Sequence, residues 1–181
     1  SATIAEGEVL QLTAAADLAT TEEIYFKVVR GKTAALFSAA MEVGGVIAGA
    51  DDVKVQALFD YGDALGIAFQ IVDDLLDYGG TDVIGKNTGD DFRERKLTLP
   101  VIRAIAAADA DERAFWDRTI GRGRQDDGDF DRAMAILTKH GSLHATRDTA
   151  LEWAARAKGA LAPLPDHDLK TMLSDLADYV V

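Results

Sequence analysis

The chain contains no cysteine, which excludes a disulfide framework and any chemistry that depends on a thiol. Absence of cysteine is compatible with a reducing compartment, and we expect the protein to be cytoplasmic. An excess of positive charge is also missing, because the formal net charge is −12 at pH 7. An acidic chain without a basic run is poorly suited to nucleic acid, so we expect no nucleic-acid partner.

Long apolar runs and alternating strand patterns are missing as well. The longest weakly polar stretch, residues 34–50, contains Ser38 and Glu42 and is too short and too polar for a convincing membrane span. We therefore expect no stable membrane insertion.

No linker rich in proline, glycine and serine divides the 181 residues, and a hydrophobic content of 48% is enough for one substantial core. The pattern predicts a single domain over residues 1–181.

Helical patterns cover most of the chain. Thr20 and Glu23 have the spacing of a capping box, and the apolar pattern behind them continues toward Gly49. A second helix is predicted from Asp51 to the glycine pair at 79–80. Further helices are predicted after Thr98 and over residues 111–119, 130–140, 142–161 and 166–180. The expected fold class is all-α.

The segment 66–78 places carboxylates where a buried helix normally carries apolar side chains. At about 100° per residue, Gln70, Asp73, Asp74 and Asp77 share an arc about 100° wide, and mainly apolar residues fill the rest of the helix. A buried helix that shows one narrow edge to water would produce the same pattern. However, carboxylates one turn apart repel one another, and a multivalent cation explains their arrangement better. The stripe is predicted to be a divalent-metal platform that lines a cavity.

Lysines flank this acidic stripe on both sides in the sequence. Lys32 lies upstream inside a helical pattern, and Lys86 and Lys96 lie downstream. Each lysine alone is typical of a solvated surface charge. Lysine is also a compact charge that suits phosphate oxygens, and Mg²⁺ in proteins typically completes its coordination with water and substrate phosphate. The combination of aspartates and lysines predicts a bound phosphate or diphosphate.

Several segments carry recognisable motifs in a defined order. They are GEVLQL at 7–12, KTAALF at 32–37, GIAFQIVDDLLDY at 66–78, GK at 85–86 and GDDFRERKLTLP at 89–100. This ordered set resembles the trans-isoprenyl (polyprenyl) diphosphate synthases, whereas a lone D-D-x-x-D would be a weak signal. Beyond Pro100 the helices fit the family without a further motif. The resemblance implies an all-α bundle of long helices around a central cavity, the isoprenoid synthase fold.

The match is incomplete. The family carries two aspartate-rich motifs, and Asp73, Asp74 and Asp77 resemble the second; the first motif and the basic N-terminal segment that holds the homoallylic substrate are missing. The sequence begins at Ser1 inside a helical pattern, so we expect the C-terminal part of a longer enzyme, without its N-terminal helices. Arg95 is a further departure, because many members carry glycine before the following lysine.

The resemblance implies a Mg²⁺-dependent prenyltransferase that extends an allylic diphosphate with isopentenyl diphosphate and releases diphosphate. In the implied mechanism, metal ions bridge the aspartates to the allylic diphosphate, and the C–O bond breaks to give an allylic cation. The isopentenyl double bond then attacks this cation, and a proton is lost. The resemblance implies that the departing diphosphate acts as the base, so no side chain is assigned that task.

The resemblance also implies roles for individual residues. Asp73 is expected to ligate the metal directly, and Asp74 and Asp77 are expected to ligate it or to orient its water molecules. Lys32 and Lys86 are predicted to act with these aspartates in catalysis by binding diphosphate oxygens.

Further substrate contacts are implied around the same group. Lys96 is expected to bind diphosphate together with the other two lysines. Thr33 and Gln70 are expected to hydrogen-bond around the diphosphate, and Phe69 is expected to form the cavity wall near the isoprenoid.

Two other function classes share some of these features. A class I terpene cyclase also uses an aspartate-rich helix and Mg²⁺, but it leaves Gly85-Lys86 and the segment 96–100 unexplained. A non-catalytic partner subunit of a prenyl synthase would be a binding protein, and the retained aspartates and lysines argue against it.

The segment 32–37 after Tyr25 resembles the long-chain quinone side-chain synthases more than the farnesyl enzymes. The resemblance further implies a homodimer.

Overall fold

The structure is a computed structural model that describes residues 17–79 and 88–181, together with positions 5, 7 and 9. Its regular elements are helical, and no strand occurs within these residues, which confirms the predicted all-α class. No helix in this described part is long and apolar enough to cross a membrane. The helices are α2 (Glu22–Val29), α3 (Ala35–Ile47), α4 (Asp52–Leu76), α5 (Asp90–Arg93), α6 (Leu99–Ala107), α7 (Ala110–Trp116), α8 (Asp129–Lys139), α9 (Ser142–Ala160) and α10 (Asp168–Val180), with π-helical turns at Arg30–Ala34 and Asp117–Gly121.

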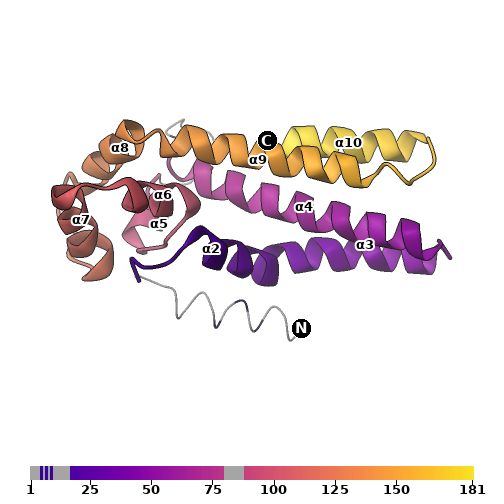
Figure 1. Ribbon diagram of the computed structural model, residues 1–181, viewed down its shortest axis with the longest axis horizontal. Coiled ribbons are helices and arrows are strands. Elements are labelled where there is room, and N and C mark those ends of the chain that lie inside the picture. Colours follow the sequence, from indigo (N-terminus) through magenta and orange to yellow (C-terminus); the bar gives the residue numbers. More distant parts are fainter. Residues whose placement is uncertain (1–4, 6, 8, 10–16, 80–87) are drawn as a thin grey trace.

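The long helices form a bundle, and the short helices gather at one end of it (Figure 1). α4 is the central helix, with α3 packed along one side and α9 along another. α10 returns along α9 and also contacts α4. The C-terminal end of α4, which carries the acidic stripe, lies where the long bundle meets the cluster of short helices.

The first long helix differs from the sequence prediction. Its N-cap is Thr21, whose hydroxyl accepts the Ile24 N–H at 3.3 Å, and Glu23 forms an i,i+4 ion pair instead of a capping box with Thr20. The π-helical turn Arg30–Ala34 interrupts the helix, which then continues as α3. The π turn moves the buried positions on by one residue, from Tyr25 and Val29 to Ala34 and Ser38, but no proline interrupts the sequence there, which is why it predicted one continuous helix.

Glycines let α4 pack closely against the backbone of α3 and of the π-helical turn. A Cβ atom on Gly62 would lie 2.6 Å from the Phe37 carbonyl oxygen, and a Cβ atom on Gly66 would lie 2.7 Å from the Ala34 Cα. Only glycine fits such a close crossing without moving a backbone. The crossing places the π-helical turn, with the predicted site residues on it, against the acidic end of α4.

Buried side chains connect α4 to the elements around the acidic stripe. Ile67 and Ile71 are fully buried and share one apolar cluster with Tyr25 of α2, Leu99 of α6 and Ala150 of α9. Full burial of a side chain of isoleucine size typically contributes about 1.5–3 kcal/mol. The acidic stripe therefore lies on a firmly packed support.

Aromatic packing fixes the short-helix end of the molecule. Phe92 of α5 is buried, and its ring lies 6.5 Å from Phe115, 6.4 Å from Trp116 and 6.0 Å from Phe130, measured between ring centroids. Aromatic pairs at such distances contribute about 0.5–1.5 kcal/mol beyond area burial. This cluster positions α5 and the segment 91–96 beside the end of α4.

Candidate active site

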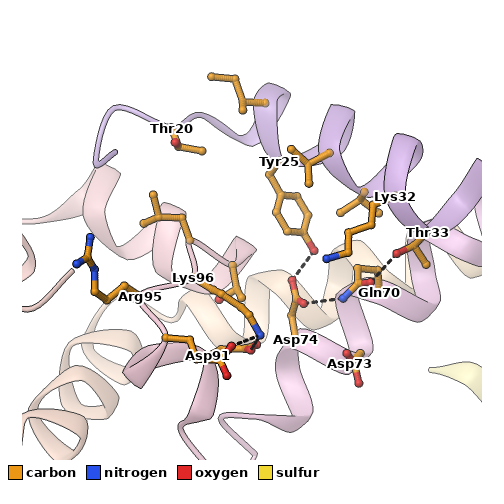
Figure 2. A pocket seen from close by; sticks show the side chains of 16 residues that line it. Thr20, Tyr25, Lys32, Thr33, Gln70, Asp73, Asp74, Asp91, Arg95 and Lys96 are labelled. Carbon is orange, nitrogen blue, oxygen red and sulfur yellow. Dashed lines mark hydrogen bonds and ion pairs between the residues drawn. The ribbon is translucent and has the colours of Figure 1, made fainter. Parts of the chain in front are cut away.

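The acidic end of α4 borders a cavity of about 480 Å³. The cavity lies between α2, the π-helical turn, α4 and the connection from α5 to α6 (Figure 2). Segments far apart in the sequence meet here. The predicted site residues in its lining are Lys32, Thr33, Gln70, Asp73, Asp74 and Lys96.

A chain of hydrogen bonds connects three sides of this cavity (Figure 2). The Thr33 hydroxyl donates to Gln70 Oε1 at 2.8 Å, and Gln70 Nε2 donates to Asp74 Oδ1 at 2.9 Å. The hydroxyl of Tyr25 donates to the other carboxylate oxygen, Asp74 Oδ2, at 2.7 Å. Burial, together with the Asp74 charge, raises the pKa of Tyr25 well above its ordinary value, so this hydroxyl keeps its proton and acts as a donor. Both oxygens of Asp74 therefore accept a hydrogen bond from the protein.

Asp74 carries its charge in an unfavourable environment. Burial is the main cause that raises the pKa of Asp74 from 3.8 to about 7. The hydrogen bonds from Tyr25 and Gln70 lower this pKa, while the negative charges of Asp91 and Asp73 raise it. A cation placed beside the carboxylate would offset both the burial and the repulsion.

Replacing Asp74 by asparagine is expected to stabilise the metal-free chain, because it removes a buried charge and keeps the shape. The folded wild type binds a proton more tightly than the unfolded chain, so its stability falls as pH rises from about 4 to about 7. The Asp74→Asn gain should be about 2–4 kcal/mol near pH 8 and smaller near pH 5. Thermal unfolding with a metal chelator measures the gain, and a wild type at least as stable as the variant near pH 8 would contradict it.

Lysines approach Asp74 from two sides (Figure 2). Lys32 extends from the π-helical turn, and Lys96 extends from the segment before α6. Lys96 Nζ lies 2.9 Å from Asp91 Oδ1 and 2.7 Å from Glu94 Oε2. Partial burial disfavours its charge, but the hydrogen bonds to both carboxylates more than offset that cost and raise the pKa of Lys96. The cavity thus combines carboxylates with ammonium groups, a combination suited to a metal-bridged diphosphate.

Some predicted site residues do not line this cavity. The carboxylate of Asp77 accepts the first backbone N–H groups of α5 at 3.1 and 2.9 Å, so it connects the end of α4 to α5. Phe69 is 45% exposed and lies beside Phe37, with 5.6 Å between ring centroids. Lys86 lies outside the residues that the structure describes. The roles assigned to Asp77, Phe69 and Lys86 stay predictions.

The carboxylates at the cavity fit a particular kind of metal site. Within residues 17–79 and 88–181, and at positions 5, 7 and 9, no three acidic or histidine side chains form a complete metal-binding group. Mg²⁺ commonly uses only one or two carboxylates and takes its remaining ligands from water and substrate phosphate. Asp73 and Asp74 supply adjacent carboxylates at the cavity, which fits Mg²⁺ bound together with a diphosphate.

Tyr25 and Asp91 line the cavity but were not among the predicted site residues. Tyr25 precedes Lys32 by seven residues, a spacing that would place both on one face of a regular helix; the π-helical turn that contains Lys32 departs from that geometry, yet both residues line the cavity. Asp91 lies in the recognised motif 89–100, but its ion pair with Lys96 depends on how the chain turns after α5. Neither carries a signal strong enough to separate it from ordinary core or surface residues.

The departure at Arg95 has a backbone explanation. The φ angle of Arg95 is 61°, in the left-handed region that favours glycine. Its guanidinium lies against Gly123, where a Cβ atom would come within 2.6 Å of Arg95 Nη1. The backbone conformation that suits glycine is therefore present without glycine, and Lys96 still faces the cavity.

A model of the polyprenyl synthetase family matches residues 1–137 of the chain. The chain belongs to the polyprenyl synthetase family. This match confirms the resemblance inferred from the motifs between Gly7 and Pro100, and it extends beyond them.

Similar proteins within this family include synthases of several bacteria. The octaprenyl diphosphate synthase of Haemophilus influenzae is 41% identical over 175 residues, which cover 96% of this chain and 53% of the relative. The crystal structure of a decaprenyl diphosphate synthase from Rhodobacter capsulatus matches with a TM-score of 0.95 and 72% identity, over 99% of this chain and 55% of that chain. The crystal structure of the polyprenyl synthase of Caulobacter crescentus, complexed with calcium and isoprenyl diphosphate, matches with a TM-score of 0.93 and 50% identity. The match covers 98% of this chain and 55% of that chain.

The chain spans about half the length of these relatives. Its helical bundle has the same arrangement as the matching part of the solved polyprenyl synthases, which confirms the isoprenoid synthase fold.

Proposed function

We propose that residues 1–181 form the C-terminal part of an enzyme that extends an allylic diphosphate with isopentenyl diphosphate and releases diphosphate. The observation that carries this proposal is the convergence of Asp73 and Asp74 with Lys32 and Lys96 on one cavity. Such a set of charges suits a diphosphate bridged to the protein by a divalent metal. Family membership and the synthase relatives support the same activity.

We propose Mg²⁺ as the cofactor, with Asp73 as the direct ligand and Asp74 as a ligand or an orienting group. Bound Mg²⁺ would neutralise the leaving diphosphate. Asp77 stays a predicted metal ligand or water-orienting group, and its hydrogen bonds to the first N–H groups of α5 also hold the segment that carries Asp91 and Lys96. The Caulobacter crescentus relative, solved with calcium and isoprenyl diphosphate, supports a divalent cation beside an isoprenyl diphosphate in this fold.

The other cavity residues bind and shield the reacting group. Lys32 and Lys96 bind diphosphate oxygens and stabilise the negative charge that develops as the allylic C–O bond breaks. Thr33 and Gln70, already bonded to each other, provide further polar contacts to the same group. Apolar side chains of α2 limit access of water to the allylic cation, which the isopentenyl double bond attacks. The departing diphosphate accepts the proton that this step releases.

We propose a long-chain product. The octaprenyl and decaprenyl diphosphate synthases that match this chain at 41% and 72% identity support this choice, and so does the motif at 32–37. A cytoplasmic location and a homodimer stay predictions.

The surface of α3 supports the proposal that another part of the enzyme packs against this chain. Leu36, Val43, Val46 and Ile47 are each more than half exposed, with fractions of 63%, 52%, 61% and 81%. Glu42 is the only charged residue of α3. An exposed apolar helix face of this kind is typical of a contact surface. We propose that N-terminal helices of the complete enzyme cover α3.

Product analysis tests this function against both alternatives. The complete protein that carries this chain is incubated with an allylic diphosphate and Mg²⁺, with or without radiolabelled isopentenyl diphosphate. We expect longer linear polyprenyl diphosphates only when isopentenyl diphosphate is present. A terpene cyclase would release a hydrocarbon without it, and a non-catalytic partner subunit would bind diphosphate without forming product.

Lys32→Ala is expected to weaken use of the allylic substrate in particular. The lysine faces the cavity from the π-helical turn, and loss of a charged hydrogen-bond donor should raise the KM for the allylic diphosphate by about tenfold or more. The KM for isopentenyl diphosphate should change little, and Lys86→Ala should behave in the same way. Lys27→Ala is the matched control, because Lys27 on α2 is exposed and pairs with Glu23. Equal increases of both Michaelis constants in Lys32→Ala would contradict this placement.

A further inference from the structure

Tyr25 is a buried side chain whose polar end reaches the candidate site. It is 6% exposed, and its ring packs edge-on against Phe26 with 5.4 Å between centroids. Its hydroxyl crosses from α2 to α4 and donates to Asp74 Oδ2 at 2.7 Å (Figure 2). A phenylalanine would fill the same space, so the packing alone does not require a hydroxyl.

Tyr61 is a second buried tyrosine, and its hydroxyl has an ordinary backbone acceptor. It is also buried, and its hydroxyl donates to the backbone carbonyl of Leu173 on α10 at 2.8 Å. Buried tyrosine hydroxyls usually find a partner of this kind. The hydroxyl of Tyr25 donates instead to a carboxylate that lines the cavity. This difference indicates a role for Tyr25 beyond packing.

The donors on Asp74 determine how its carboxylate is oriented. Gln70, one turn earlier on the same helix, donates to Oδ1, and Gln70 is itself bonded to Thr33. Tyr25 donates to Oδ2 from a different helix. Rotation of the carboxylate would break these bonds. The bond from Tyr25 therefore sets the position of Asp74 relative to α2, the helix that leads directly into Lys32.

We propose that Tyr25 is a positioning residue for a site that binds diphosphate with Mg²⁺, and that it acts through Asp74. The inference rests on the proposed function. Tyr25 fixes the spacing between the carboxylates of α4 and Lys32, and the diphosphate binds between them. Loss of the hydroxyl weakens Mg²⁺-dependent diphosphate binding without unfolding the protein.

A comparison of Tyr25→Phe with Tyr61→Phe in the complete protein tests this role. Each substitution removes one buried hydroxyl and one hydrogen bond, but only the first bond reaches the cavity. Calorimetric titration with inorganic diphosphate in MgCl₂ measures binding, and thermal unfolding measures the fold. We expect about tenfold weaker binding for Tyr25→Phe, the loss typical when a group that supports a metal ligand is removed. Binding by Tyr61→Phe should be unchanged.

A double-variant comparison tests whether Tyr25 acts through Asp74. Asp74→Asn alone should weaken diphosphate binding. Adding Tyr25→Phe should then cause little further loss, because the carboxylate that Tyr25 orients is already absent. Independent roles would instead multiply the two losses.

The outcomes separate this inference from the proposed function. Three results would overturn the positioning role of Tyr25 and leave the proposed function standing. They are wild-type binding by Tyr25→Phe, equal losses of binding in both tyrosine variants, and multiplied losses in the double variant. If Tyr25→Phe no longer unfolds cooperatively, the hydroxyl is required for the fold itself, and the positioning role is overturned as well. A wild-type protein that binds no diphosphate in the presence of Mg²⁺ would overturn the proposed function, and the inference with it.

Discussion

Asp73→Asn is expected to reduce prenyl transfer by the complete protein at least about a hundredfold. Asp73 lies on α4 at the cavity, beside Asp74, and asparagine removes its charge while preserving its size. Loss of a comparable electrostatic contribution raises a reaction barrier by about 3 kcal/mol. Steady-state turnover at saturating Mg²⁺ measures this effect.

Asp60→Asn is the matched control for that variant. Asp60 is an exposed residue of the same helix, and its carboxylate accepts a hydrogen bond from Gln56 outside the cavity. Turnover by Asp60→Asn should match the wild type. Near-normal turnover by Asp73→Asn at saturating Mg²⁺ would contradict the assignment of the metal to Asp73.

The isolated 181-residue chain is expected to catalyse no prenyl transfer. Stabilisation of a leaving diphosphate by two metal ions requires ligands on both sides of the diphosphate. Asp73 and Asp74 come from one helix, and the first aspartate-rich motif of the family is not in this sequence. The relatives are about twice as long as the matched region, so the missing ligands are expected on the remaining part.

Addition of the N-terminal part of the enzyme as a separate chain is expected to restore some activity. Its helices would cover the apolar face of α3, which is otherwise a site of non-specific association. Incorporation of radiolabelled isopentenyl diphosphate measures the recovery. Elongation by the isolated chain at a rate near that of the complete protein would contradict the requirement for metal ligands on both sides of the diphosphate.

The existence and type of the long helices could be predicted from the sequence, because local signals mark them. The second helix was predicted to start near Asp51, and Asp51 is the N-cap of α4, where its carboxylate accepts the Lys54 N–H at 3.0 Å. Helices predicted at 130–140 and 142–161 occur at Asp129–Lys139 and Ser142–Ala160. Caps, glycine stops and apolar periodicity depend on residues close in the chain, so they are visible without a structure.

The partners within the acidic stripe could not be predicted in the same way. Asp74 and Asp77 share one arc of a helical wheel, but Asp74 bonds to Tyr25 and Asp77 bonds to the start of α5. Tyr25 is 49 residues away from Asp74, and no periodicity encodes that pairing. The π-helical turn at Arg30–Ala34 likewise moves the buried positions on by one residue, and no residue in the sequence marks that turn as a proline would mark a helix end.

An experimental structure of the complete protein with MgCl₂ and an unreactive allylic thiolodiphosphate tests the proposed site most directly. We predict a Mg²⁺ ion about 2.0–2.1 Å from an oxygen of Asp73, bridged to the diphosphate. The diphosphate oxygens should lie between Lys32 and Lys96 in the cavity described above. A diphosphate bound away from this cavity, or bound there without a metal ion at Asp73, would contradict the assignment.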